Sequence, residues 1–166
     1  MKPRIHVRRA RLQDAAPIAS VNAEGVPGVT PMGAEAVARA IGAATLFLVA
    51  EADGAVQGYL IAYDPDREYD GEEFLWFRER GRDFLYVDQI AVSARARGAG
   101  VGRALYDEAA REAAGRGLAF LVCEVNIRPP NPHSTAFHQR LGFSEIGRLE
   151  VRLHSRFVAL MRRPLP

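Results

Sequence analysis

Residues 87–109, VDQIAVSARARGAGVGRALYDEA, decide the fold of this chain. They join an apolar strand pattern to a glycine-rich turn and then to an amphipathic helix pattern. Glycines at 98, 100 and 102 let the turn adopt unusual dihedral angles and let a ligand approach the backbone closely. The unpaired amides and positive dipole end of the following helix favour a bound phosphate. The stretch therefore predicts a turn that binds a pyrophosphate.

The spacing of the glycines separates the ligands that use such a turn. A Walker loop needs G-x-x-x-x-G-K-[ST], but Arg103-Ala104 follows here, with no lysine and no metal-binding hydroxyl. A dinucleotide fingerprint needs G-x-G-x-x-G, and the third glycine falls one place early. The pattern that fits is [QR]-x-x-G-x-[GA] between a strand and a helix. A tight turn in which glycine serves packing alone is the remaining alternative.

A second motif lies downstream, where Glu124-Val125-Asn126 precedes NPHSTAFHQRLGF at residues 131–143. Asn131 and Ser134 favour the start of a helix, and Gly142 favours its end before a strand. Together the two motifs resemble those of the GNAT N-acetyltransferases, over about the C-terminal half of the chain. His138 departs from the family pattern, since many members have tyrosine at this position.

The resemblance implies that the turn binds acetyl-CoA as cosubstrate. In that family the backbone at the end of the strand pairs with the pantetheine arm, and the turn grips the diphosphate. The cofactor-binding residues implied are Ile90, Ala91, Val92, Arg97, Gly98, Ala99, Gly100, Val101, Gly102, Arg103 and Asn131. For Asn131 the alternative is a simple helix cap.

Acetyl transfer to an amine needs a proton acceptor for the amine and a proton for the departing thiolate. Glu124 is the first choice of base, because it matches a glutamate that some protein N-terminal acetyltransferases of this family use, and burial would raise its pKa. Its alternative role is a carboxylate paired with an arginine. Asp88 is the second choice of base, or a carboxylate that ties down loop amides. His138 is expected to stabilise or protonate the thiolate, and its alternative role is a packed residue.

The order of patterns predicts an α/β (α+β) fold, a mixed central sheet of about six or seven strands with helices on both faces. Two strands that flank one helix, at 84–92 and 118–126, should run parallel and splay apart at the cofactor site. Strands are also expected at 5–9, 45–50, 56–63, 146–153 and 157–161, and helices at 14–23, 34–43, 101–114 and 134–141. Asp53-Gly54 is expected to form the hairpin turn between the strands at 45–50 and 56–63. The absence of a linker predicts a single domain over residues 1–166.

Composition narrows the class of protein. A chain of 166 residues with 48% hydrophobic residues and a net charge of +2 is ordinary for a soluble domain and argues against nucleic acid as a partner. No membrane span is expected, and a single cysteine, Cys123, favours a core role and a reducing cytoplasm. His6, His133 and His154 lack the spacing of metal ligands, so no metal is implied. A homodimer is compatible with this interpretation.

The best interpretation is an acetyl-CoA-dependent N-acetyltransferase that acts directly on a primary amine, either a small molecule or a peptide. Acidic residues occur at 64–73 and are followed by Phe74, Trp76 and Phe77. One hypothesis is that this segment attracts a cationic amine. The alternative is a solvated loop that its aromatic residues anchor to the core. Two other functions are also consistent with the sequence. One is an acyl-CoA-binding sensor that has lost catalysis, and the other is a nucleotide-binding α/β protein.

Overall fold

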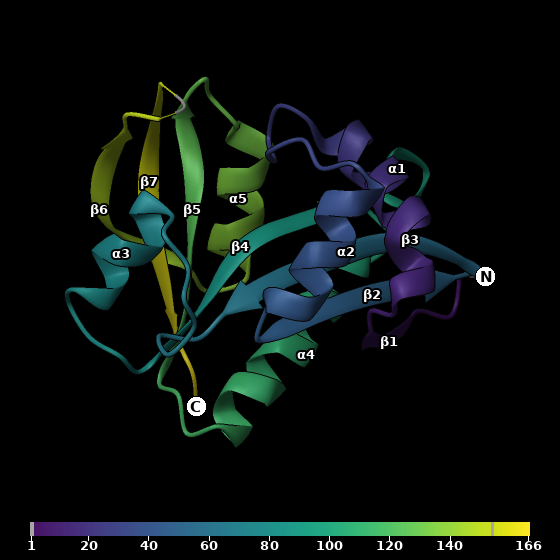
Figure 1. Cartoon of the computed structure of the whole chain (residues 1–166), viewed down its shortest axis with the longest axis horizontal. Helices are drawn as coiled ribbons and strands as arrows, with labels where there is room; N and C mark the ends of the chain where they lie inside the picture. The colour runs from purple at the N-terminus through teal and green to yellow at the C-terminus, as the bar shows by residue number, and fades with distance from the viewer. Residues whose placement is uncertain (1, 154) are drawn as a thin grey trace. The chain divides into compact units, whose positions relative to one another are not determined.

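The computed structural model describes residues 2–153 and 155–166 of the chain. The strands of these residues form one seven-stranded sheet in the order β1-β2-β3-β4-β5-β7-β6, with β4 and β5 parallel (Figure 1). Their bounds are β1 His6–Arg9, β2 Leu46–Ala52, β3 Ala55–Tyr63, β4 Phe84–Val92, β5 Phe120–Arg128, β6 Ser144–Val151 and β7 Arg156–Pro164. The predicted mixed sheet is therefore confirmed.

Five α-helices and two short 3-10 helices connect the described strands. The α-helices are α1 Ala15–Gly25, α2 Ala34–Ala43, α3 Glu72–Arg78, α4 Val101–Gly115 and α5 Pro132–Arg140. The 3-10 helices are η1 Leu12–Asp14 and η2 Ala94–Ala96. Within the described part of the chain, no helix combines the length and the apolar character that a bilayer crossing requires.

The chain divides into two compact units, each of which is described by itself. The first unit comprises residues 1–63 and 88–111, and the second comprises residues 64–87 and 112–166. Because the boundaries fall inside β4 and α4, each unit contains one part of these two elements. The expectation of a single domain stays a prediction.

In the first unit, helices pack on both faces of the sheet, as predicted. Tyr59 of β3 accepts a hydrogen bond from Asn22 of α1 at 2.9 Å. The preceding residue, Gly58, points to the opposite face because side chains alternate along a strand. A Cβ atom at Gly58 would lie 2.8 Å from Val101 and 3.3 Å from Leu105, both in α4. Gly58 therefore allows the start of α4 to approach the sheet closely.

The hairpin between β2 and β3 confirms the predicted turn at Asp53-Gly54. Both residues have positive φ angles, 52° and 76°, as a two-residue hairpin turn with an Asp-Gly pair requires. The antiparallel register then places buried apolar residues of β2 beside those of β3. This hairpin carries most of the core of the first unit.

In the second unit, β5 lies between the first half of β4 and the antiparallel pair β6–β7. The parallel register with β4 joins Phe84, Leu85 and Tyr86 to Phe120, Leu121 and Val122. Cys123 is buried, which confirms its predicted place in the core. The splaying of the two strands at the cofactor site stays a prediction.

The segment between β3 and β4 differs from its prediction as a loop, because it contains the helix α3. Glu72 and Glu73 occupy the first turn and Arg78 the last, which suits the helix dipole. Phe74 and Phe77 are buried and stack against Phe84 and Tyr86 of β4. A helix of two turns gives too short a periodicity to distinguish from an aromatic loop, so packing decides this element.

Other element boundaries differ from their predictions by up to three residues, and two of these shifts have a clear local cause. Strand β5 begins at Phe120, after Gly117 has ended α4 with a positive φ angle of 75°. Helix α5 begins at Pro132, because a proline at the first helical position loses no hydrogen bond and its ring presets φ. Both shifts leave the predicted site residues in the expected elements.

Candidate active site

The glycine turn of the first unit has the backbone shape that its sequence predicted. It follows β4 and η2, and it leads directly into α4. Gly98 and Gly100 have φ angles of 78° and 91°, which L side chains rarely adopt. A Cβ atom at Gly98 would meet nothing within 4 Å, so glycine is needed there for conformation and the space beside it is open. An open backbone surface is what a bound diphosphate requires.

The amides at the start of α4 are suited to an anion. The helical bonds begin where Ala104 N donates to Gly100 O at 3.0 Å. The amides of Val101, Gly102 and Arg103 lie in the first turn, where an α-helix provides no carbonyl partner. The amide of Ala99 instead donates to Ala96 O at 3.2 Å and shapes the turn. Exposed Arg97 and Arg103 add positive charge to the same segment.

A small polar network holds this turn to β3. Buried Ser93 donates its hydroxyl to Gln57 Oε1 at 2.5 Å, and its amide donates to Gln57 O at 2.8 Å. Arg95 Nε donates to the same side-chain oxygen at 3.3 Å. Glu24 of α1 accepts the amide of Ala94 at 2.5 Å. No motif in the sequence indicates Gln57, because its role depends on a neighbour 36 residues away.

The end of β4 presents a mixed face in the first unit. Asp88, Ile90 and Val92 are half-buried, whereas the intervening residues are buried, so Asp88 shares the face of Ile90, as the alternation of side chains along a strand requires. Burial raises the pKa of Tyr59 to about 12, and the charge of Asp88 contributes to that shift. Burial and, secondly, Asp88 likewise raise the pKa of Tyr63 to about 12. Both phenols are therefore neutral donors at neutral pH.

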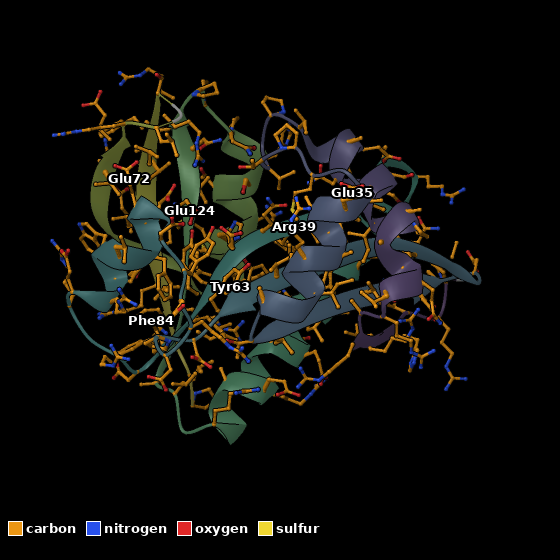
Figure 2. All side chains as sticks on the ribbon, in the orientation of Figure 1. Glu35, Arg39, Tyr63, Glu72, Phe84 and Glu124 are labelled. Carbon is orange, nitrogen blue, oxygen red and sulfur yellow. The ribbon has the colours of Figure 1, made fainter. Side chains whose placement is uncertain are left out.

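Glu124 lies on β5 in the second unit and is half-buried (Figure 2). Its Oε2 accepts a hydrogen bond of 2.7 Å from the hydroxyl of Tyr86, a residue of β4 that is 1% exposed. A charge-assisted bond of this kind favours the ionised carboxylate. The phenol is one donor to this carboxylate, and the alternative role of Glu124 as a carboxylate paired with an arginine stays a prediction.

Two residues farther along β5, Asn126 belongs to a buried network. Arg156 of β7 donates to Asn126 Oδ1 at 3.0 Å and to Glu73 Oε1 at 2.9 Å. Glu73 is 5% exposed and lies in the first turn of α3. Its carboxylate and the guanidinium of Arg156 therefore compensate each other, and they fix α3 beside β5 and β7.

His138 is 3% exposed and lies in the last turn of α5. Its Nδ1 lies 2.7 Å from Ser134 O, so Nδ1 carries the proton and donates to this carbonyl. In the neutral ring Nε2 is then an acceptor. Burial lowers the pKa of His138 below its ordinary value of 6.5, and the hydrogen bond to Ser134 opposes this only in part. Donation of a proton from Nε2 therefore requires the imidazolium form.

Asn131 acts as the N-cap of α5. Its Oδ1 accepts a hydrogen bond from Ser134 N at 3.3 Å, and its carbonyl accepts one from Thr135 N at 3.1 Å. The predicted capping role is confirmed, and a contact with the cofactor stays a prediction. Because Asn131 and His138 share α5, the cap fixes one end of the helix that carries the histidine.

The acidic segment before α3 is partly neutralised. Asp66 pairs with Arg82 at 2.7 Å, and Asp64 lies 3.9 Å from Arg116. Glu72, at the start of α3, has one buried carboxylate oxygen that accepts no hydrogen bond from the described residues (Figure 2). A role of Asp64 and Asp66 in attracting a cationic amine stays a prediction.

The structure divides the predicted site residues between the two units. Asp88, the end of β4 and the glycine turn lie in the first unit, whereas Glu124, Asn131 and His138 lie in the second. Among the described residues, no group of three metal-ligating side chains is present. His154, one of the histidines considered above, lies outside the described residues.

Comparison with known proteins identifies both the family and the fold. The model of the acetyltransferase (GNAT) family matches residues 23–143. No curated protein matches the chain in sequence. The structure is similar to that of Ard1 from Thermoplasma volcanium, with a TM-score of 0.79, 17% identity and 98% of each chain covered.

Two further structures have named acceptors. The ribosomal-protein-S18-alanine N-acetyltransferase from Escherichia coli has a TM-score of 0.73 and 19% identity, with 98% of this chain and 94% of that chain covered. A phosphinothricin acetyltransferase from Sinorhizobium meliloti, in complex with AcCoA, has a TM-score of 0.74 and 25% identity. It covers 99% of this chain and 89% of its own.

Proposed function

Because this chain belongs to the acetyltransferase (GNAT) family, we propose that it transfers an acetyl group from acetyl-CoA directly to a primary amine. The observation that carries the proposal is the open glycine turn at the start of α4. The amides of Gly100, Val101, Gly102 and Arg103 would bind the diphosphate, with Arg97 beside them. Acetyl-CoA supplies the activated thioester.

The residues of the chain then provide the proton transfers. A protonated amine has no lone pair, so its proton must leave before it attacks the thioester, and Glu124 is the proposed acceptor. Its bond with Tyr86 supports this role, because the donor keeps the carboxylate ionised. Backbone groups of Ile90, Ala91 and Val92 would hold the pantetheine arm and the acetyl carbonyl. Asp88 is the alternative base, and Asn131 is a further proposed contact with the cofactor.

The acceptor amine belongs to one of two chemical classes. The similar structures include one enzyme named for an alanine of a ribosomal protein and another named for phosphinothricin. A peptide N-terminus and a small-molecule amine are therefore both tested as acceptors. In the acidic segment, Glu68, Asp70 and Glu72 are the residues proposed to attract a cationic amine, because Asp64 and Asp66 lie close to arginines.

One specific observation supports the rival function of a catalytically weak acyl-CoA-binding sensor. The Nδ1 proton of His138 is donated to Ser134 O. Because the pKa of His138 is lowered, little of the ring is protonated on Nε2 at neutral pH, and little of it can donate a proton to the thiolate. Thiol release from acetyl-CoA with a panel of peptides and small amines distinguishes the two functions. Release with any acceptor supports the enzyme, and binding of acetyl-CoA without release supports the sensor.

A matched pair of variants tests whether the glycine turn binds acetyl-CoA. Gly98 and Gly117 have φ angles of 78° and 75°, and a Cβ atom at either would meet nothing within 4 Å. G98A and G117A should therefore be strained to a similar extent, about 1–2 kcal/mol each. Calorimetry should show that G98A weakens acetyl-CoA binding about tenfold, about 1.4 kcal/mol, whereas G117A binds as the wild type does.

Equal affinity of the two variants would contradict the assignment. ATP and NAD serve as comparison ligands, because a nucleotide-binding protein would bind one of them in preference to acetyl-CoA. Absence of acetyl-CoA binding by the wild-type chain would remove the proposal altogether.

A further inference from the structure

Tyr86 carries a role that no motif in the sequence indicates. It pairs with Val122 in the parallel register of the second unit, so its hydroxyl reaches the carboxylate two residues farther along β5. The bond from this hydroxyl to Glu124 Oε2 is 2.7 Å long, and the phenol is almost fully buried. A buried hydroxyl with a charged acceptor forms one of the stronger hydrogen bonds in proteins.

The ring of Tyr86 is held by the segment that separates β3 from β4. Phe74 of α3 stands edge-on to it, with 5.7 Å between ring centroids and 62° between planes. Phe77 of the same helix and Tyr69 before the helix lie 6.1 Å and 6.2 Å from it. Aromatic rings at these separations pack favourably, and together they fix the position of the phenol.

The helix that supplies these rings is itself anchored on the face of β5 that carries Glu124. Residues 124 and 126 share one face of the strand because side chains alternate. Asn126 accepts from Arg156, and Arg156 also donates to Glu73 of α3. A continuous series of contacts therefore leads to the carboxylate of Glu124. It runs from the anchored helix α3 through its aromatic rings to the phenol of Tyr86.

We propose that Tyr86 is a positioning residue for Glu124, supported by α3, and that it holds the carboxylate in its ionised, proton-accepting form. This inference rests on the proposed function, in which Glu124 is the base. The phenol touches neither substrate nor cofactor in this role. It acts through the carboxylate, orienting Oε2 and stabilising its charge.

Other charged groups of the second unit have interactions of their own. Glu73 of α3 and Arg156 of β7 form an ion pair with each other. Burial lowers the pKa of His138 of α5, so its ring is neutral at neutral pH. The hydroxyl of Tyr86 is the donor to Glu124 on which the proposal rests.

The test is the variant Y86F, which keeps the ring and removes the donor. The acidic limb of the kcat/KM profile reports the base of the free enzyme, so it should move upward by about one to two pH units. Turnover should fall most on the acidic side of the profile, with KM for acetyl-CoA unchanged. The matched control is Y59F, which also removes a buried phenol donor, here the one bonded to Gln89 Oε1. Y59F should leave the limb in place.

A second variant keeps the test decisive if Y86F does not fold. Fluorotyrosine at position 86 retains the hydroxyl but makes it a stronger donor, so the limb should move to lower pH. An unmoved limb in the folded Y86F or in the fluorotyrosine protein would overturn the inference. The variant E124Q separates this failure from that of the proposed function. If E124Q is inactive and the limb is unmoved, only the role of Tyr86 fails. If E124Q turns over at the wild-type rate, the base assignment fails and the role of Tyr86 with it.

Discussion

At the scale of single residues, His138 decides whether the family chemistry is complete in this chain. In the neutral ring its proton is engaged with Ser134 O. We expect H138A to slow acetyl transfer about 10²-fold, the lower end of what a proton donor contributes, while H138Y retains activity because a phenol also carries a proton. Steady-state kinetics of thiol release test both variants. An alanine variant with wild-type turnover would assign His138 to packing alone.

The lowered pKa of His138 also predicts how stability depends on pH. The unfolded chain protonates this imidazole near pH 6.5, whereas the folded chain does so at lower pH because the ring is buried. Between these two pH values the unfolded state binds more protons, so the free energy of unfolding decreases as the pH falls below about 6.5. The decrease is at most about 1.4 kcal/mol per pH unit for one group.

Urea unfolding of wild type and H138Q at about pH 7.5 and about pH 5 measures this contribution to the free energy of unfolding. The two pH values lie on either side of 6.5, each about one unit or more from it. The glutamine does not titrate, so H138Q should lose less stability across the interval. H133Q is the control, because His133 lies on the same helix and is exposed. Identical slopes for wild type and H138Q would show that the buried ring does not govern acid sensitivity.

At the scale of elements, long periodic segments were predictable and short packed ones were not. The pattern for α2 predicted its observed bounds, and the Asp-Gly pair predicted the hairpin turn. Helix α3 was missed, because its two turns are stabilised by Phe74 and Phe77 stacking on β4 rather than by periodicity. The start of β5 differs from its prediction, since Leu118 and Ala119 continue the apolar pattern but precede the first strand residue, Phe120.

The same contrast applies to the candidate site. The shape of the glycine turn follows from its composition, and the face of Asp88 follows from strand alternation. The donor to Glu124 could not be read from the strand pattern alone, because it depends on the register between two strands 36 residues apart, Phe84 with Phe120. If the parallel alignment of Tyr86 with Val122 were known, it would indicate that Tyr86 can donate to Glu124.

The contact between β3 and α4 gives a prediction about an element. A Cβ atom at Gly58 would lie 2.8 Å from Val101 and 3.0 Å from the carbonyl oxygen of Ala91. G58A should therefore destabilise the chain by about 1–3 kcal/mol, since it overpacks the interface on which the start of α4 rests. Acetyl-CoA affinity should fall as well, because the turn precedes that helix.

Chemical denaturation and calorimetry measure the two effects of G58A. The control is G42A in α2, where an added Cβ would meet nothing within 4 Å. Alanine is the better helix former, so G42A should stabilise the chain by about 0.5–1 kcal/mol and leave acetyl-CoA affinity unchanged. A stable G58A variant with wild-type affinity would show that the helix tolerates a displacement from the sheet.

At the scale of the whole molecule, the proposed site residues are divided between the two units. The first contains the cofactor turn and Asp88, and the second contains Glu124 and His138. Each unit has its own network of polar hydrogen bonds. In the first unit Ser93 donates to Gln57 next to the glycine turn, and in the second unit Arg156 donates to Asn126 and to Glu73 of α3. Binding and proton transfer should therefore be separable by mutation.

The two alternative bases test this separation, because one lies in each unit. E124Q should lower kcat by about 10²–10⁴-fold with little change in acetyl-CoA affinity, since the amide cannot accept the amine proton. D88N changes a residue beside Ile90, on the strand that would hold the pantetheine arm, and should mainly alter affinity. If D88N lost turnover while E124Q retained it, Asp88 would be the base, and the ionised carboxylate beside Tyr86 would serve the structure of the second unit instead.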